Sequence, residues 1–364
     1  MNHLPLPRAA VTRGVAVAVG LGTLLTLVLP ADASGKAARH GTLSKHTLPA
    51  SANYPSRDYF QYVPATLPPA GKRTLVVYLH GCTQTAEQAL KGVRWNELAD
   101  SRHFVVVYPD QRIPSGAADA TDGSPAGCWN SGNGAVSARG TGELGSVAQI
   151  TQVVARHYAV DSRRIYVAGI SGGAMMASAL AVVYPDLYAA VGHVANCAYL
   201  CADAMGALSY QRMGSYARVV PVIDIQGSAD DVVTMGLEEE SVQQWLSTDD
   251  WADDGQLNGS VSRVPSSLEN RGLGAPSPRV PGELCLRDFP RNPCPGGLLG
   301  SYPVTIRHYT SASGHELLQA WTIHGLMHNY SGGSTSGSFT DPYGPDITSA
   351  LYAFFDEHPQ GGKP

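Results

Sequence analysis

The chain has 364 residues, 43% of them hydrophobic, and a formal net charge of -5 at pH 7. This length and apolar content suit one large globular domain with an ample core. The basic residues are dispersed along the sequence rather than clustered, which excludes the usual electrostatic signature of a nucleic-acid-binding protein.

The first 33 residues have the features of a secretory signal peptide. Arg8 and Arg13 give a positive start, residues 15–29 are apolar, and residues 31–33 are small enough for cleavage. A membrane anchor is the alternative, but the apolar run is shorter than the roughly 20 residues that a span needs. We expect a secreted, extracellular protein with no membrane association after cleavage, which begins with a flexible leader over residues 34–50.

The chain contains six cysteines, which in a secreted protein favour three disulfides, with free buried thiols as the alternative. Proximity in the sequence, and elimination for the remaining pair, predict Cys197–Cys201, Cys285–Cys294 and Cys82–Cys128. The sequence has no Cys-x-x-Cys or His-Glu-x-x-His pattern, and its 12 histidines do not cluster at ligand spacing. We therefore expect no metal and no cofactor.

The hydrophobic pattern predicts strands that alternate with helices. Strands are expected at 59–64, 75–79, 104–108, 164–168, 189–194, 219–225, 304–309 and 317–323, and helices at 86–102, 143–158, 174–181, 238–251 and 347–357. Residues 252–300, rich in Gly, Pro, Ser and Asn, form an irregular insertion in this prediction. Such alternation favours the α/β class, with a mostly parallel central sheet covered by helices on both faces, in one catalytic domain over residues 51–360.

The segment Gly169-Ile170-Ser171-Gly172-Gly173 lies between a strand pattern and a helix pattern. A serine in a tight strand-to-helix turn needs small neighbours because the backbone there is strained and crowded, and the flanking glycines meet that need. The turn also places the next N–H group at a helix N-terminus, where developing negative charge is stabilised. The pattern alone also fits a simple Gly-rich turn. Its context indicates the nucleophile elbow of an α/β-hydrolase, with Ser171 as the nucleophile.

This fold requires an acid and then a histidine after the serine in chain order. Asp230 follows a predicted strand and is the candidate acid, with Asp231 as the fallback, because a carboxylate there can hold the imidazole tautomer. His328 lies in a loop past the last predicted strand and is the candidate base. We prefer it to His324, which is expected to pack at the strand end.

A second oxyanion donor is expected in the loop after an early strand, so that the backbone N–H groups of Cys82 and Gly172 face the developing charge. A disulfide from Cys82 to Cys128 would rigidify this loop and bring Trp129 to the cleft as an apolar wall for substrate. A plain core position for Trp129 is the equal alternative. Tyr330, in the loop after the candidate base, is the other residue assigned to substrate binding.

Several ordered motifs resemble the secreted esterases of the polyhydroxybutyrate depolymerase and feruloyl esterase group, within the α/β-hydrolase superfamily. They are Leu79-His80-Gly81-Cys82-Thr83-Gln84-Thr85, Cys128-Trp129-Asn130, Arg139-Gly140-Thr141-Gly142-Glu143, residues 167–175, residues 184–192, Gly325-Leu326-Met327-His328, Gly332-Gly333 and residues 340–346. The resemblance covers roughly residues 55–230 and 317–358 and implies the same triad and the same two oxyanion donors.

The chain departs from that group at Gln226, where the family often has His, at Ser331, where Pro is usual, and across residues 232–300. Many polymer depolymerases of the group append a polymer-binding domain, and because this chain ends soon after its last helix we expect none after the triad.

The sequence therefore predicts a monomeric secreted serine esterase that hydrolyses carboxylic esters through an acyl-enzyme. Short-chain hydroxyalkanoate esters or oligomers are the expected substrates. A feruloyl or acetyl esterase of plant polysaccharide and a secreted acyltransferase remain open, as do a peptidase and a non-catalytic binding protein.

Overall fold

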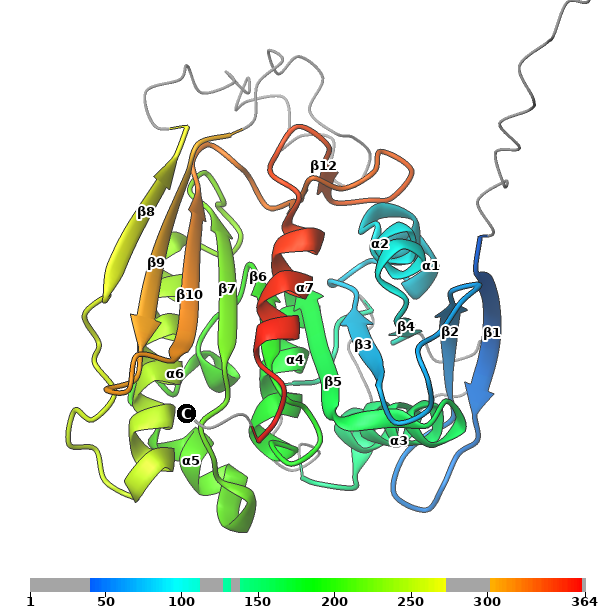
Figure 1. Cartoon of the computed structure of the whole chain (residues 1–364), viewed down its shortest axis with the longest axis horizontal. Helices are drawn as coiled ribbons and strands as arrows, with labels where there is room; N and C mark the ends of the chain where they lie inside the picture. The colour runs from blue at the N-terminus through cyan, green and yellow to red at the C-terminus, as the bar shows by residue number, and fades with distance from the viewer. Residues whose placement is uncertain (1–39, 112–126, 132–137, 273–301, 362–364) are drawn as a thin grey trace, which may run out of the picture. The chain divides into compact units, whose positions relative to one another are not determined.

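The computed structural model describes residues 40–111, 127–131, 138–272 and 302–361, and the chain forms a compact unit from His40 onward. A ten-stranded sheet in these residues has the spatial order β1 (Thr42–Leu48), β2 (Arg57–Val63), β4 (Val105–Pro109), β3 (Arg73–Leu79), β5 (Val160–Ile170), β6 (Val191–Val194), β7 (Val222–Gly227), β10 (Glu316–Ile323), β9 (Val304–Thr310) and β8 (Ser267–Arg271) (Figure 1). The run from β4 to β10 is parallel, and the strands outside it pair antiparallel. The mostly parallel sheet predicted from the sequence is confirmed.

Helices cover both faces of this sheet, as expected for buried parallel strands. One face carries α1 (Ala86–Gly92), α2 (Trp95–Arg102) and α7 (Ile347–Glu357); the other carries α3 (Gly142–His157), α4 (Gly172–Val183) and α6 (Met235–Asp254), with the short α5 (Ala207–Met213) beside α4 and α6. A separate small ladder joins β11 (Tyr330–Ser331) to β12 (Thr340–Asp341). The α/β class and the two helical layers are therefore as predicted.

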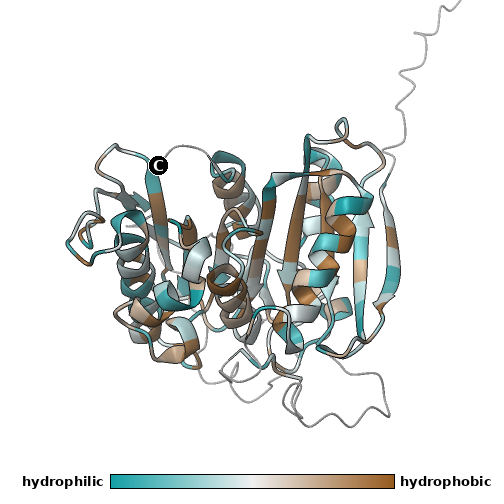
Figure 2. Ribbon diagram, turned by 90° about the horizontal axis from the view of Figure 1, so that it is seen from below, coloured by the Kyte–Doolittle hydropathy of each residue, from teal (hydrophilic) through white to brown (hydrophobic). Residues whose placement is uncertain are grey.

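The core is divided between the two faces by the alternation of side chains along each strand. In β3, Val77 and Leu79 belong to the hydrophobic cluster beneath α3, α4 and α6, whereas Val76 and Tyr78 belong to the cluster beneath α7. Figure 2 shows the central strands coloured as largely hydrophobic, while the strands at the β1 edge are paler and partly hydrophilic. The continuous apolar runs that predicted the central strands thus reflect burial on two sides.

The predicted helix over residues 86–102 is two helices in the structure. Arg94, the residue just before α2, adopts a left-handed backbone conformation with φ of 58°. This conformation interrupts the helical path between α1 and α2 and changes the chain direction there. Thr85 begins α1 with a capping box, because its hydroxyl accepts the Gln88 N–H while the Gln88 side chain accepts the Thr85 N–H. The apolar spacing continues across Arg94, so periodicity alone did not reveal the break.

The expected flexible leader over residues 34–50 is wrong for its second half. Residues 42–48 form β1, which pairs antiparallel with β2 along its whole length. The Nζ atom of Lys45 lies 2.7 Å from Oδ2 of Asp58, and the hydroxyl of Thr47 donates to the other carboxylate oxygen. Because both faces of this edge strand are largely exposed, it needs no alternating apolar residues, and the sequence pattern gave no strand signal.

Several predictions fall wholly or partly outside the described residues: the signal peptide over residues 1–33, the start of the leader, and the Cys285–Cys294 pair. Of the predicted insertion at 252–300, residues 273–300 also lie outside them, whereas residues 267–271 form the edge strand β8. Among the described residues, no helix combines the length and apolarity needed to cross a bilayer.

Candidate active site

Ser171 occupies a strained turn between β5 and α4. Its φ of 56° and ψ of −126° lie in a region that costs a non-glycine residue free energy, and such strain persists only where the surrounding structure enforces it. The Ser171 N–H donates to the carbonyl of Val194 at 2.8 Å, which ties the turn to the end of β6. The side chain is partly exposed at the carboxyl edge of the parallel strands.

Close backbone approaches explain the glycines around Ser171. A Cβ atom at Gly173 would lie 2.2 Å from the carbonyl oxygen of Leu79, and one at Gly169 would lie 2.4 Å from the carbonyl of Gly173. Neither neighbour is a flexible side chain, so no substituent fits at these positions. The glycines therefore allow β3, β5 and α4 to meet closely enough to hold the strained serine.

Asp230 and His328 are in direct contact. The Nδ1 atom of His328 lies 2.7 Å from Oδ2 of Asp230, and both residues are buried, at 9% and 6% exposure. The second carboxylate oxygen of Asp230 accepts the backbone N–H groups of Val232 and Val233, each at 2.9 Å. The carboxylate can thus fix the imidazole orientation and stabilise a positive charge on it.

The loops that carry this acid and this histidine are joined by hydrogen bonds. The Ser228 N–H donates to the carbonyl of Ile323 at 2.9 Å, and the Ala229 N–H donates to that of Leu326 at 3.0 Å. In return, the N–H of Gly325 donates to the Ser228 hydroxyl at 2.9 Å. Because β7 and β10 are parallel neighbours, their following loops leave the same edge and can be joined in this way.

Asp231 and His324, the alternative acid and base, do not take part in the contact between Asp230 and His328. Asp231 is exposed, and the contact to His328 comes from Asp230 alone. His324 sits at the end of β10, where its Nε2 atom lies 2.9 Å from the hydroxyl of Thr305. This geometry favours Asp230 over Asp231 and His328 over His324.

The structure places the serine at the same sheet edge as the acid–histidine pair. Ser171 follows β5, Asp230 follows β7 and His328 follows β10, all strands of the parallel run. Among the described residues the Ser171 hydroxyl forms no hydrogen bond with His328. Catalytic hydrogen bonds are often long in ligand-free enzymes and shorten when substrate binds.

The two candidate oxyanion donors come from adjacent segments. A Cβ atom built on Gly172 would lie 2.6 Å from Sγ of Cys82 and 3.5 Å from its backbone nitrogen, so the loop after β3 packs directly against the start of α4. Cys82 forms a disulfide with Cys128, and the other disulfide in the described residues joins Cys197 to Cys201.

Trp129 and Tyr330 lie in the interior rather than on a cleft surface. Trp129 is 5% exposed and its indole N–H donates to the carbonyl of His80 at 2.8 Å, which fits the alternative core position. Tyr330 is 1% exposed, its hydroxyl lies 2.8 Å from that of Thr348, and its ring meets the ring of Tyr78 edge-on. The substrate contact assigned to Tyr330 is therefore replaced by a packing role.

Gln226 is a residue whose position was not anticipated. It is the penultimate residue of β7 and is almost fully buried, and its amide nitrogen donates to the carbonyl of Val233 at 2.5 Å, across the loop that holds Asp230. The signal in the sequence was the replacement of the usual His by Gln at this position. The amide closes the acid loop onto its own strand.

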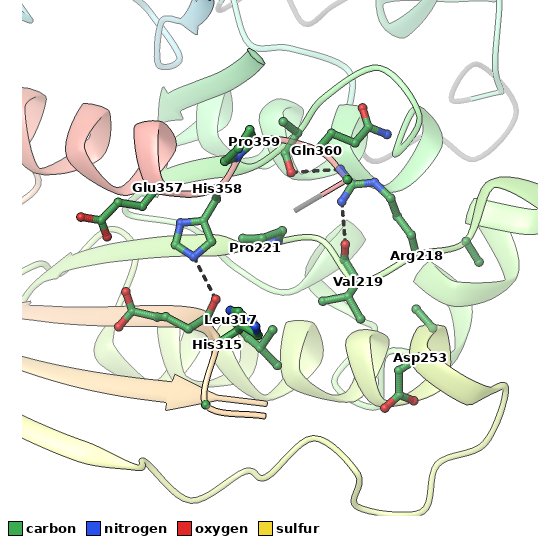
Figure 3. Close-up of a pocket in the computed structure, with 16 residues that line it drawn as sticks. Arg218, Val219, Pro221, Asp253, His315, Leu317, Glu357, His358, Pro359 and Gln360 are labelled. Carbon is green, nitrogen blue, oxygen red and sulfur yellow. Dashed lines mark hydrogen bonds between the residues drawn. The ribbon is translucent and has the colours of Figure 1, made fainter. Parts of the chain in front are cut away.

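A cavity of about 580 Å³ lies away from the triad candidates, near the amino ends of strands β6, β7 and β10 (Figure 3). Arg218, Pro221, Leu317 and His358 line it, and the dashed bonds in Figure 3 show His358 bonded to the backbone of Glu316. None of the triad candidates borders this cavity. In the described part of the chain, no cluster of three or more His, Cys, Asp or Glu side chains is arranged to hold a metal ion.

The chain is similar to several curated esterases. It is 29% identical to poly(3-hydroxyalkanoate) depolymerase C of Paucimonas lemoignei over 236 residues, which is 60% of this chain and 54% of that protein. It is 33% identical to feruloyl esterase B of Neurospora crassa and 32% identical to acetylxylan esterase A of Emericella nidulans, each over 146 residues, 39% of this chain and 44% of each relative. The chain thus spans about half the length of the curated relatives it matches.

A solved structure, the acetyl xylan esterase from Aspergillus awamori, superposes on this chain with a TM-score of 0.57 at 18% identity. The superposed region covers 86% of this chain and 99% of the chain of that esterase. At this identity the likeness shows the α/β-hydrolase fold and no more. Residues 58–243 match the family described as esterase PHB depolymerase, where PHB is polyhydroxybutyrate. That match covers about half of the sequence, and we conclude that the chain belongs to the PHB depolymerase esterase family.

Proposed function

We propose that the protein is a secreted serine esterase that hydrolyses carboxylic esters through Ser171, His328 and Asp230. The observation that carries this proposal is the buried 2.7 Å contact between Asp230 and His328, at the sheet edge from which the strained Ser171 projects. Family membership supports the same class of reaction.

In the proposed reaction, His328 accepts the Ser171 hydroxyl proton on Nε2 while the serine oxygen attacks the ester carbonyl. The backbone N–H groups of Cys82 and Gly172 stabilise the negative charge that develops on the carbonyl oxygen. His328 returns the proton to the departing alkoxide, which leaves as the alcohol. Water then attacks the acyl-enzyme with His328 again as the base, and the carboxylic acid is released with Ser171 restored.

Short-chain hydroxyalkanoate esters or oligomers are the proposed substrates, supported by the similarity to a poly(3-hydroxyalkanoate) depolymerase. Acetyl or feruloyl esters of plant polysaccharide are the second candidate, because relatives of comparable similarity carry those names. An acyltransferase would use the same first half-reaction and give the acyl group to a sugar hydroxyl instead of water. The proposed arrangement is one catalytic domain, extended at its start to include β1, after a cleaved signal peptide, acting as a monomer.

The test is an ester panel run on the wild type, Ser171→Ala and His328→Ala, with His324→Ala as the matched control. The panel holds short-chain nitrophenyl esters, methyl ferulate, acetylated xylan and a polyhydroxybutyrate suspension, each with and without a sugar acceptor. We expect Ser171→Ala and His328→Ala to lose at least about 10³-fold in kcat, and His324→Ala to retain its activity.

Intact mass spectrometry during turnover should detect an added acyl group on the wild type and none on Ser171→Ala. Equal turnover by the wild type and Ser171→Ala would refute the proposed nucleophile. Preferential acyl transfer to the sugar would instead identify an acyltransferase.

A further inference from the structure

We propose that a buried ion pair between Arg57 and Glu143 positions the loop that carries the candidate oxyanion donor Cys82. This inference rests on the proposed function, because it concerns the placement of the Cys82 N–H. Arg57 is 1% exposed and Glu143 is 2% exposed, and Nη2 of Arg57 lies 3.1 Å from Oε1 of Glu143. Burial of two charges is costly and repaid only by good geometry with further hydrogen bonds, which both side chains have here.

The guanidinium of Arg57 joins three parts of the fold. Its Nε donates to the hydroxyl of Ser146 in α3, and its Nη1 donates to the carbonyl of Asp110 after β4, both at 2.8 Å. Its central carbon lies 5.3 Å from the ring centre of Trp129, a distance that suits cation–π contact. The guanidinium of Arg57, fixed by these hydrogen bonds, therefore packs against the ring of Trp129.

The carboxylate of Glu143 binds the backbone of Asn130, the residue that follows Trp129. Its Oε2 accepts the backbone N–H of Asn130 at 2.5 Å, and its Oε1 also accepts from the amide nitrogen of Gln111 at 3.4 Å. Glu143 lies in the first turn of α3, where the helix dipole favours a negative charge. Between them, Arg57 and Glu143 hold Trp129 and Asn130, the two residues that follow Cys128.

Two links carry this positioning to the candidate oxyanion loop. One is the disulfide between Cys128 and Cys82. The other is the bond from the Trp129 indole N–H to the carbonyl of His80, two residues before Cys82. A shift of residues 128–130 must therefore displace the segment that presents the Cys82 N–H. Because an oxyanion donor acts only when it is fixed close to the developing charge, such a shift should slow the chemical step.

The test compares kcat and KM, per titrated active site, for the wild type, Glu143→Gln, Glu143→Ala and Arg57→Lys with a short-chain nitrophenyl ester. Active sites are counted by complete labelling with an organophosphonate and intact mass spectrometry. We expect kcat to fall by about 10- to 100-fold in Glu143→Ala while KM stays within about threefold of the wild type. Glu143→Gln should lose less, because its amide oxygen can still accept the Asn130 N–H.

Arg218→Met is the matched control. Arg218 is half-buried, and its guanidinium donates to the carbonyls of Pro185, Tyr188 and Ala189 near the amino ends of the parallel strands, far from the candidate site. Its loss should lower the melting temperature and leave kcat per titrated site unchanged. A Glu143→Ala variant that melts earlier but keeps wild-type kcat per site would overturn the inference.

If Glu143→Ala does not fold, the same kcat readout on Glu143→Gln and Arg57→Lys decides, and wild-type values in both would reject the positioning role. An active Ser171→Ala would instead undermine the proposed function. Normal kcat in the Glu143 and Arg57 variants beside an inactive Ser171→Ala refutes this inference alone.

Discussion

Asp230 holds His328 with one carboxylate oxygen and is itself held by the other. Oδ2 lies 2.7 Å from Nδ1 of His328, while Oδ1 accepts the N–H groups of Val232 and Val233. With Nδ1 bonded to the carboxylate, the remaining ring nitrogen, Nε2, is the one that faces away from Asp230. A proton on Nδ1 would leave Nε2 unprotonated, which is the tautomer that the proposed role of His328 as general base requires.

Replacing Asp230 by Asn should lower kcat by about 10⁴-fold, because an amide cannot hold the same tautomer or stabilise the imidazolium. Asp231→Asn is the matched control at the exposed neighbouring position, and its kcat should stay within about twofold of the wild type. Steady-state kinetics on a short-chain nitrophenyl ester measures both. An equal loss in the two variants would count against Asp230 as the acid.

Gly173→Ala should destabilise the protein by about 1–3 kcal/mol or more, because the new Cβ would meet the carbonyl oxygen of Leu79 at 2.2 Å. Gly236→Ala, in the first turn of α6, is the control, since the nearest atom to its Cβ is the Thr234 hydroxyl at 3.7 Å. That variant should gain up to about 1 kcal/mol from its higher helix propensity. Urea unfolding measures both, and a tolerated Gly173→Ala would show that α4 can move away from β3.

The two disulfides should differ in how much they stabilise the fold. Cys82 and Cys128 are 46 residues apart, whereas Cys197 and Cys201 are 4 apart. Loop-closure entropy in the unfolded chain then gives about 4 kcal/mol for the first and about 2 kcal/mol for the second. Paired Cys→Ser variants and their free energies of unfolding test this order, which would be wrong if the short loop proved the more stabilising.

Glu238 should make stability fall as pH rises. Burial, and next the carboxylate of Asp224, raise the pKa of Glu238 from 4.5 to about 8, although Arg307 lies 3.2 Å away and acts in the opposite direction. The folded protein therefore binds this proton more tightly than the unfolded chain does. Its contribution is complete below about pH 4.5 and is lost as the pH rises to about 8.

Glu238→Gln resembles the protonated form at every pH, so it should become more stable relative to the wild type from pH 5 to pH 9. Denaturant unfolding of both proteins at pH 5, 7 and 9 measures the difference. Parallel stability profiles would show that Glu238 does not titrate differently in the folded and unfolded states.

The central strands were predictable and the edge strands were not, for one physical reason. β3 and β4 are buried on both faces, so their apolar runs are continuous and bounded by turns. β1 and β8 are mostly exposed and are held by backbone pairing, which leaves little trace in side-chain chemistry. The break at Arg94 depends on one backbone torsion angle and was equally invisible to periodicity.

The order of motifs located Asp230 and His328 at the ends of two strands, and the structure brings their side chains into contact. Side-chain direction was beyond reach: Tyr330 and Trp129 follow residues of the site but turn inward, where their polar atoms find partners. The role of Gln226 was also hidden, since its bond to Val233 depends on the path of a loop.

The hydrogen bonds of Ser228 and Ala229 to the loop after β10 join the segment that carries Asp230 to the segment that carries His328. Ser171 is anchored through Val194 to β6, which is the parallel neighbour of β7, the strand that carries the Asp230 loop. A substitution that shifts either of the two joined loops should therefore move Asp230 and His328 together.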